Sequence, residues 1–265
     1  MIQVYALASG SAGNATYVRC GNTRVLIDAG ISFKRIKDEL KKLDCRPEDL
    51  DGLFLTHEHE DHIKGIGTLL KQTDIPVYGT KETWEALGDK IDSYRHRFIR
   101  LTKKVPFASA DIYPFSISHD AANPVGYCIY SNRKKITVVT DLGFVTDTVR
   151  QALDGSHVLL LEANHDIDML RYGPYPVSLR NRILGTKGHL SNEGAGWAVV
   201  NMERPDNMQL ILAHRSSRNN NPDLQWLTVA SILEGRGLEL GEDITMMQAQ
   251  EKTCVGCTLK EEYDE

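Results

Sequence analysis

The segment His57-Glu58-His59-Glu60-Asp61-His62 carries three histidines and an aspartate within six residues. It directly follows Leu53-Phe54-Leu55-Thr56, a run typical of a buried strand. Imidazole and carboxylate groups are common protein ligands of Zn²⁺ and its first-row neighbours. Burying four such groups together costs too much free energy unless something compensates them, and a pair of metal ions would do so. The alternative is a polar loop with chance histidines.

The spacing of these residues fits convergence on one point. Side chains i and i+2 on extended backbone point to the same side of the chain, so His57, His59 and Asp61 can face one site. His62 departs from this alternation, as expected where the chain turns into a helix over 63–72. Two ligands can then serve one ion and two can serve the other.

The composition is that of an ordinary globular protein. The chain has 265 residues, 41% hydrophobic and 25% charged, which indicates one large domain or two small ones. No apolar run approaches the roughly 18 residues needed to cross a bilayer, so we expect no membrane partner. The first residues contain no basic region and resemble a strand, so we expect no signal peptide; with the five scattered cysteines this favours a cytoplasmic protein. The sequence leaves the oligomeric state open.

The net charge of −5 argues weakly against a nucleic-acid partner, but the charge is unevenly distributed. Residues 239–265 contain eight acidic residues and two lysines, so the preceding 238 residues carry a net charge of +1. Two basic clusters lie in that part of the chain: Lys34, Arg35, Lys37, Lys41 and Lys42, and Arg95, Arg97, Arg100, Lys103 and Lys104. Such clusters either contact a phosphate backbone or form solvated surface.

Strand-like and helical patterns follow one another in two successive blocks, each with strands first and helices after. The helices include one capped by Ser32, one opened by Ser191 and one over 222–234. This order predicts an α/β fold, a four-layer αβ/βα sandwich over residues 1–240. Residues 241–265 are expected to be a C-terminal appendage of uncertain order, in which Cys254 and Cys257 are thiols without a metal.

Three further ligand candidates each follow an apolar strand. His119 follows 112–118, Asp141 follows 135–140, and His214 follows 210–213. Each alone could be a turn residue or a helix cap. Together with residues 57–62 they provide about the number of ligands that two ions need, held at the ends of rigid strands.

The order of these residues resembles the sequence motifs of the metallo-β-lactamase superfamily: Asp28, His57-x-His59-x-Asp61-His62, His119, Asp141 and His214. The resemblance covers about residues 1–236 and implies the four-layer fold with a dinuclear site at one edge. It implies that His57, His59 and His119 bind one ion, that Asp61, His62 and His214 bind the other, and that Asp141 bridges them. Asp28 would accept a histidine N–H and fix the tautomer of that ring, unless it only caps a turn.

Five further segments resemble the YycJ (WalJ) type branch, bacterial cytoplasmic proteins regarded as DNA exonucleases: Ala8–Asn14, Thr140–Gly143, Leu161–Asp166, Gly188–Asn192 and His214–Ser217. The same region is similar to tRNase Z, which has a glutamate, a catalytic histidine and a terminal histidine ligand where this chain has Glu162, His189 and His214. The chain lacks the long arm with which tRNase Z grips tRNA, so DNA is favoured over RNA as the substrate.

The resemblance implies a phosphodiester hydrolase of the 5′–3′ exonuclease type with two divalent ions, Zn²⁺ or Mn²⁺, and Fe²⁺ is also compatible. Such ions lower the pKa of a shared water, and the resulting hydroxide would attack phosphorus beside Asp61. His189 is the expected proton donor to the leaving oxygen, oriented by Glu162, unless it only marks the entry to a helix.

Other residues near these motifs have two interpretations. His165 either contacts substrate phosphate or a metal, or has a structural role. Ser9, Ser11 and Asn14 lie in a glycine-rich loop, which either brings backbone N–H groups near a phosphate or is an ordinary tight turn.

Different functions remain compatible with these motifs. A small-molecule metallo-hydrolase of the same superfamily would act on a cyclic phosphodiester, a thioester or a lactam. A di-iron redox module resembles His-x-Glu-x-Asp-His, and this chain has His59 where the glutamate would be. A non-catalytic scaffold is disfavoured because no ligand position is missing.

Overall fold

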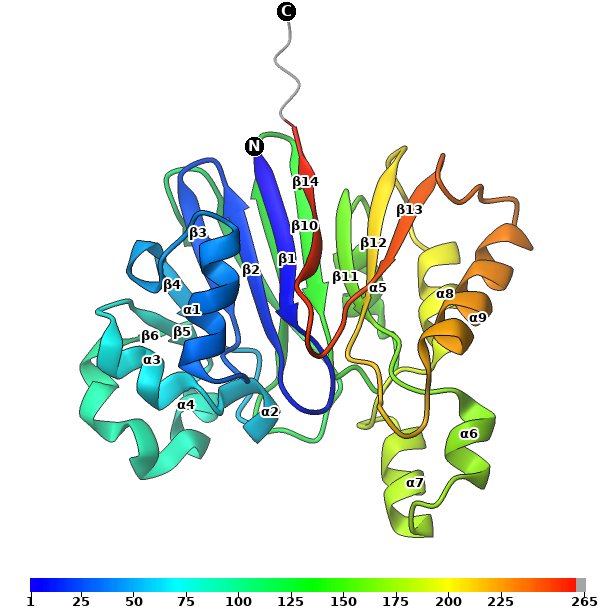
Figure 1. The fold of residues 1–265 in the computed structure, drawn as a ribbon, viewed down its shortest axis with the longest axis horizontal. Helices are drawn as coiled ribbons and strands as arrows, with labels where there is room; N and C mark the ends of the chain where they lie inside the picture. Colours follow the sequence, from blue (N-terminus) through cyan, green and yellow to red (C-terminus); the bar gives the residue numbers. More distant parts are fainter. Residues whose placement is uncertain (261–265) are drawn as a thin grey trace, which may run out of the picture.

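Two seven-stranded β-sheets lie face to face, with helices on their outer faces (Figure 1). The structure, a computed structural model, describes residues 1–260 apart from the side chains of residues 89 and 90. The strand order is β14-β1-β2-β3-β4-β5-β6 in the first sheet and β13-β12-β11-β10-β9-β8-β7 in the second. The predicted four-layer α/β sandwich is therefore confirmed.

The first sheet and its helices come mainly from the N-terminal half of the chain. The strands are β1 (Ile2–Ala8), β2 (Ala15–Cys20), β3 (Thr23–Ile27), β4 (Gly52–Phe54), β5 (Val77–Gly79), β6 (Phe98–Arg100) and β14 (Val255–Leu259). The helical segments are α1 (Phe33–Lys42), η1 (Pro47–Asp49), α2 (Glu60–Ile63), α3 (Ile66–Gln72), α4 (Lys81–Leu87) and η2 (Gly88–Arg97). Helix α1 begins as predicted, because Ser32 accepts a hydrogen bond from the amide of Arg35.

The second sheet and its helices follow. The strands are β7 (Val105–Pro106), β8 (Asp111–Ser116), β9 (Val125–Ser131), β10 (Lys134–Val139), β11 (Val158–Glu162), β12 (Met208–Ala213) and β13 (Ile244–Gln248). The helices are α5 (Asp147–Leu153), α6 (Ile167–Tyr172), α7 (Val177–Leu184), α8 (Asn192–Val200) and α9 (Pro222–Glu234). Strands β10 to β13 pair in parallel, and β11 is buried on both faces, which explains its continuous apolar sequence.

Aromatic side chains fill the space between the two sheets. The ring of Phe54 stacks on Tyr78 at a centroid distance of 4.5 Å and meets the edge of Tyr127 at 5.4 Å. Tyr127 is fully buried on β9, and its hydroxyl donates a hydrogen bond to the carbonyl of Leu55, just after β4. Because β4 and β9 belong to different sheets, this bond ties the sheets together two residues before His57.

The C-terminal residues differ from the expected appendage. Strand β13 pairs with β12 at one edge of the second sheet, and β14 pairs antiparallel with β1 at one edge of the first. Residues 241–260 therefore complete both sheets, and residues 261–265 lie outside the described part of the chain. The sequence analysis missed these strands because their short, mixed sequences lack a clear alternation of apolar and polar residues.

The two cysteines near the C-terminus contact different parts of the core. Cys254 packs against the core under the first layer of helices, whereas Cys257 packs against the core between the sheets. No disulfide joins cysteines within the described residues.

The helix predicted over 63–72 is interrupted. It forms two short helices, α2 and α3, which are separated at Lys64 and Gly65. A side chain at Gly65 would place its Cβ only 2.0 Å from the carbonyl oxygen of Ile31, so glycine permits this close approach. Helices α6 and α7 were not anticipated. Within the described residues, no helix is long and apolar enough to span a membrane.

Replacing Tyr127 with phenylalanine should lower the free energy of unfolding by about 1–3 kcal/mol, because the buried carbonyl of Leu55 loses its donor. Urea denaturation would measure the change. Tyr130→Phe on the same strand is the matched control, since Tyr130 is 43% exposed and should change stability by less than about 0.5 kcal/mol. Equal effects of the two substitutions would contradict a specific role for the Tyr127 hydroxyl.

Candidate metal centre

The candidate site lies where strands of both sheets end. Asp28 follows β3, His57 comes shortly after β4, Asp141 comes after β10, and His214 follows β12. Asp28, Asp141 and His214 adopt left-handed backbone conformations, with φ values of 61°, 58° and 51°. Such conformations are uncommon for residues other than glycine and concentrate at functional sites.

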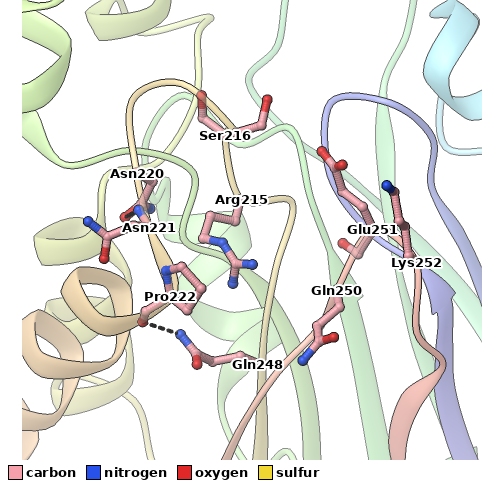
Figure 2. Close-up of a pocket in the computed structure, with 11 residues that line it drawn as sticks. Arg215, Ser216, Asn220, Asn221, Pro222, Gln248, Gln250, Glu251 and Lys252 are labelled. Carbon is pink, nitrogen blue, oxygen red and sulfur yellow. Dashed lines mark hydrogen bonds between the residues drawn. The ribbon is translucent and has the colours of Figure 1, made fainter.

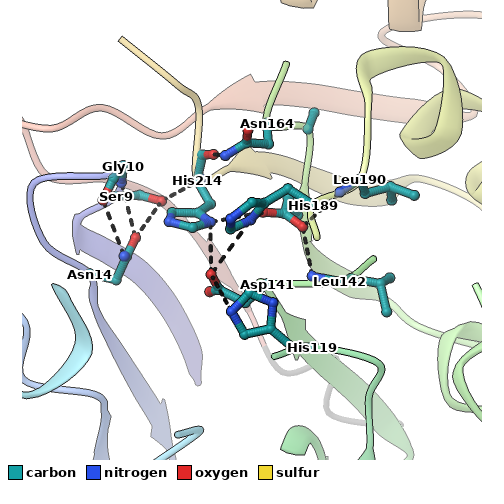
Figure 3. Close-up of polar contacts among 12 residues, drawn as sticks. Ser9, Gly10, Asn14, His119, Asp141, Leu142, Asn164, His189, Leu190 and His214 are labelled. Atoms are coloured by element: carbon teal, nitrogen blue, oxygen red, sulfur yellow. Dashed lines mark hydrogen bonds and ion pairs between the residues drawn. The ribbon is translucent and has the colours of Figure 1, made fainter. Parts of the chain in front are cut away.

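The predicted ligands gather into groups whose nitrogen and oxygen atoms lie within 4.8 Å of one another. Three of these groups are His57 with His59 and His119, Asp61 with His62 and His214, and His57 with His62 and Asp141. Asp141 thus shares a group with His57, which belongs to the first set, and with His62, which belongs to the second. Its carboxylate lies between the two clusters, and Figure 3 shows it facing His119, His189 and His214.

Contacts outside these clusters orient the histidine rings. The Nδ1 atom of His62 lies 2.7 Å from Asp28 Oδ2, and that of His119 lies 3.1 Å from the carbonyl oxygen of Gly188. An acceptor at Nδ1 fixes the tautomer and leaves Nε2 to face the centre. His59 is oriented differently, since its Nδ1 lies 3.2 Å from His119 Nε2.

The residues present fit a pair of divalent cations. The Nε2 atoms of His57 and His214 are buried and make no hydrogen bond among the described residues. Buried polar atoms without partners are rare, and each costs about 1–3 kcal/mol. Bound ions would satisfy both nitrogens, and the mixed nitrogen and carboxylate donors suit Zn²⁺, Mn²⁺ or Fe²⁺.

The electrostatics of the centre favour positive charge. Burial alone would lower the pKa of His214, but the nearby carboxylates of Asp141, Asp61 and Glu162 outweigh it and raise the pKa to about 10. Burial alone would raise the pKa of Glu162, but His189 and His214 lower it to about 2. The carboxylates that favour protonated imidazoles would also stabilise metal cations bound in place of those protons.

Glu162 is fully buried at the end of β11 and accepts four hydrogen bonds. Its Oε1 lies 2.8 Å from Nδ1 of both His189 and His214, and its Oε2 accepts from the amides of Leu142 and Leu190. Asp141, Glu162, His189 and His214 also form a group that could hold a metal. Because both oxygens of Glu162 are already occupied by donors, the geometry favours an orienting role for it.

The glycine-rich loop between β1 and β2 reaches the centre through Ser9 and Asn14. Asn14 Nδ2 lies 3.3 Å from Asp61 Oδ2 and 3.1 Å from His62 Nε2. Ser9 Oγ accepts a hydrogen bond of 2.7 Å from the amide of His214. Ser11 is exposed and contacts none of the site groups within the described residues, so the loop approaches the site through Ser9 and Asn14 instead (Figure 3).

His165 is a buried residue whose pKa is affected by Glu162 and His189. It is 2% exposed, belongs to none of the ligand groups in the described part of the chain, and makes no hydrogen bond at Nδ1. Burial lowers its pKa to about 4. Its carbonyl accepts a hydrogen bond from Asn192 at the start of α8, so its backbone also helps to position this helix.

The sequence analysis missed two residues that support the ligands. The hydroxyl of Thr56 donates to Asp28 Oδ2 at 2.7 Å and lies 2.9 Å from His57 Nδ1. Asn164 Nδ2 donates to the carbonyl of His214 at 2.8 Å. Both residues could have been found from their positions in the sequence. Thr56 directly precedes the histidine motif, and Asn164 lies two residues after Glu162.

Five of the ten residues in the two basic clusters form ion pairs with carboxylates among the described residues. Arg95, Arg97 and Lys104 of one cluster pair with Asp92, Asp74 and Asp111. In the other, Lys34 and Lys42 pair with Asp38 and Glu39 on α1. These contacts favour the interpretation of the clusters as solvated surface.

Comparison with known proteins agrees with this geometry. Residues 23–214 match the family described as Beta-lactamase superfamily domain. The chain is 38% identical to Exodeoxyribonuclease YycJ of Bacillus anthracis over 239 residues, covering 89% of this chain and 90% of that protein. It is 35% identical to Exodeoxyribonuclease WalJ of Streptococcus pneumoniae over 257 residues, covering 95% and 96%.

A solved structure extends the comparison to the fold. The metallo-β-lactamase fold protein YhfI from Bacillus subtilis superposes with a TM-score of 0.71 at 15% identity, covering 97% of this chain and 99% of that one. At this identity the likeness concerns the fold alone. Taken with the family match and the two relatives, the chain belongs to the metallo-β-lactamase superfamily and is a metal-dependent hydrolase homologous to exodeoxyribonucleases.

Proposed function

We propose that this protein is a cytoplasmic DNA exonuclease that hydrolyses phosphodiester bonds with two divalent ions. The observation that carries the proposal is the shared carboxylate of Glu162, which contacts His189 and His214 at the edge of the clustered ligands. Acyl transfer can proceed with metals alone, whereas a phosphodiester needs a proton for its leaving oxygen. The two relatives named exodeoxyribonucleases support DNA as the substrate.

We assign the ligands by their grouping. His57, His59 and His119 would hold one ion, Asp61, His62 and His214 would hold the other, and Asp141 would bridge them. Asp28 would support this set through its contact with His62. When bound, the two ions supply Lewis acidity, which lowers the pKa of water and neutralises charge on the phosphate oxygens.

His189 would donate the proton to the leaving oxygen. Its Nδ1 is held by Glu162, so Nε2 is the atom available to the substrate, and the side chain is 20% exposed. Burial disfavours the imidazolium form, but the carboxylates of Glu162 and Asp141 outweigh this effect and raise the pKa of His189. These carboxylates favour the imidazolium form, which would transfer its proton as the bond from phosphorus to the leaving oxygen breaks.

Asp61 would have a second role besides binding an ion. Its side chain is 26% exposed, whereas that of Asp141 is 3% exposed, so water can reach Asp61. Asn14 Nδ2 donates a hydrogen bond to one carboxylate oxygen of Asp61. We propose that Asp61 orients the attacking water toward phosphorus.

The substrate class is tested with end-labelled double-stranded DNA, single-stranded DNA, RNA and bis-p-nitrophenyl phosphate, each with Zn²⁺, Mn²⁺ or Mg²⁺. We expect stepwise loss of nucleotides from one DNA end. Hydrolysis of the small diester alone would instead favour a small-molecule phosphodiesterase.

His189→Ala should lower kcat for DNA by about 10²–10⁴, because the leaving oxygen loses its proton donor. The bound metal, measured by elemental analysis, should stay unchanged. His96→Ala is the matched control, since His96 is exposed on η2 and should leave kcat unchanged. A His189→Ala protein with full metal content and undiminished kcat would exclude this role.

His59→Ala should release one of the two ions and abolish DNA cleavage, because one cluster loses a ligand. Elemental analysis of the purified variant measures the metal, and the end-labelled assay measures the cleavage. If cleavage persisted in a His59→Ala protein that elemental analysis shows to have lost one ion, the proposed two-ion mechanism would be wrong.

A further inference from the structure

Helices α6 and α7 project from the sandwich beyond the ends of the strands (Figure 1). Helix α7 contains no buried residue, and α6 buries only Leu170. The hydrophobic core clusters found among the described residues include no side chain of either helix. Packing in the core therefore does not explain the apolar residues that these two helices carry.

The exposed surface of the two helices combines an aromatic ring, aliphatic side chains and a guanidinium. Tyr172 at the end of α6 is 84% exposed, more than any other large hydrophobic side chain in the described part of the chain. Arg180 and Leu184 follow Val177 on α7 at three and seven residues, so the three side chains lie on one face of this helix. Val177 and Leu184 are exposed as well. These four residues are called the α6–α7 face below.

Arg180 joins the two helices. Its Nη1 donates a hydrogen bond to the carbonyl oxygen of Arg171, the residue before Tyr172. The connection between the helices contains Pro174 and Pro176, which restrict its backbone. Tyr172 and the exposed side of α7 are therefore neighbours in a defined arrangement.

The charge around the α6–α7 face is positive. Residues 166–188 contain four basic and two acidic residues, a net charge of +2, whereas the whole chain carries −5. Arg182 pairs with Asp120, but Arg171 and Lys187 are exposed and form no ion pair among residues 1–260. Unpaired cations beside exposed apolar groups complement a polyanion that also presents apolar rings.

The loop after β12 adds a further cation beside α6. The amide of Asp166, the N-cap of α6, donates to the carbonyl of Asn219 in this loop at 2.9 Å. Arg218, the residue before Asn219, is exposed and has no carboxylate partner within the described residues. The loop begins at the candidate ligand His214, so it connects this surface to the metal centre.

Helix α7 is also joined directly to the centre. Arg182 Nε donates to Asp120 Oδ2 at 2.5 Å, and Asp120 follows the candidate ligand His119. The amide of His189 donates to the carbonyl of Ile183 on α7 at 3.0 Å. A nucleic-acid strand with one phosphodiester at the centre could therefore continue along the α6–α7 face.

We propose that the α6–α7 face binds unpaired nucleotides of the strand that is cleaved, with a base stacked on Tyr172 and phosphates near Arg171, Lys187 and Arg218. The inference rests on the proposed nuclease function. An aromatic side chain stacks on any base that is free of its own neighbours, and a base inside a duplex is not free. Basic residues combined with an exposed aromatic ring are typical of surfaces that bind single strands.

The test measures binding separately from catalysis, in metal-loaded protein that carries His189→Ala to slow cleavage. The probe is a fluorescein-labelled single strand of about 12 nucleotides of mixed sequence, which is within the usual site sizes of single-strand binders. Fluorescence anisotropy gives its Kd. Adding Tyr172→Ala should weaken binding about 5- to 150-fold, the loss of one stacked base, and should change the Kd of the blunt duplex of the same sequence little.

Tyr130→Ala in the same background is the matched control and should leave both Kd values unchanged. Tyr130 is also an exposed tyrosine, but it lies five residues along β9 from Val125, whose amide bonds to Thr56 beside the histidine motif. Arg171→Gln and Lys187→Gln should each lower the slope of log Kd against log salt concentration by about 0.7, as expected for one lost phosphate contact. Thermal unfolding checks that each variant is folded.

An unchanged Kd for the single strand in folded Tyr172→Ala protein would overturn the inference. An equal loss for the duplex would also overturn it, because a duplex presents no unpaired base for stacking. If sedimentation showed a wild-type dimer that Tyr172→Ala dissociates without loss of single-strand binding, the face would bind a second copy of the chain instead. If single-strand binding depends on Tyr172 but the wild-type protein cleaves no DNA, the face is supported and the nuclease function is contradicted.

Discussion

The buried carboxylate of Glu162 joins three loops that form the site. A charged carboxylate in the protein interior is stable only if its oxygens accept enough hydrogen bonds. Glu162 meets this requirement with donors from Leu142, His189, Leu190 and His214. Those donors lie in the loops after β10 and β12 and before α8, so the conformations of these loops depend on one another. A histidine of the metal clusters and the proposed proton donor thus share one acceptor, and a change at either should alter the other.

Much of the centre could be predicted from local sequence. The i, i+2 spacing correctly predicted that His57 and His59 share a group, whereas the expectation for Asp61 was wrong: Asp61 lies in α2 rather than on extended backbone, and it groups with His62 and His214. His119, Asp141 and His214 were recognisable because each follows an apolar strand. Neither argument needs distant contacts, since strand geometry alone determines where these side chains emerge.

Other features depend on contacts between distant parts of the chain. Ser9 and Ser11 lie in the same glycine-rich loop, and no local pattern distinguishes them. Only Ser9 is buried and bonds to His214, because the residue after β12 lies next to Ser9 in the folded chain. The break between α2 and α3 arises from the approach of Ile31 to Gly65, which no local pattern reveals. A polar pocket lined by Ser9, Arg215 and Gln250, among others, requires the connection between β13 and β14 (Figure 2), and these two edge strands have too little periodicity to be recognised from the sequence.

That connection also has a mechanical consequence. Residues 249–254 run directly from an edge strand of the second sheet to an edge strand of the first, and Figure 1 shows them crossing between the two sheets. The two halves of the sandwich each supply ligands, so hinge opening between them would strain the pairing of β13 or β14 and pull the clusters apart. The width of the centre is therefore set by the β framework. Adjustment to substrates of different size must come from loops, such as those around the exposed helices α6 and α7.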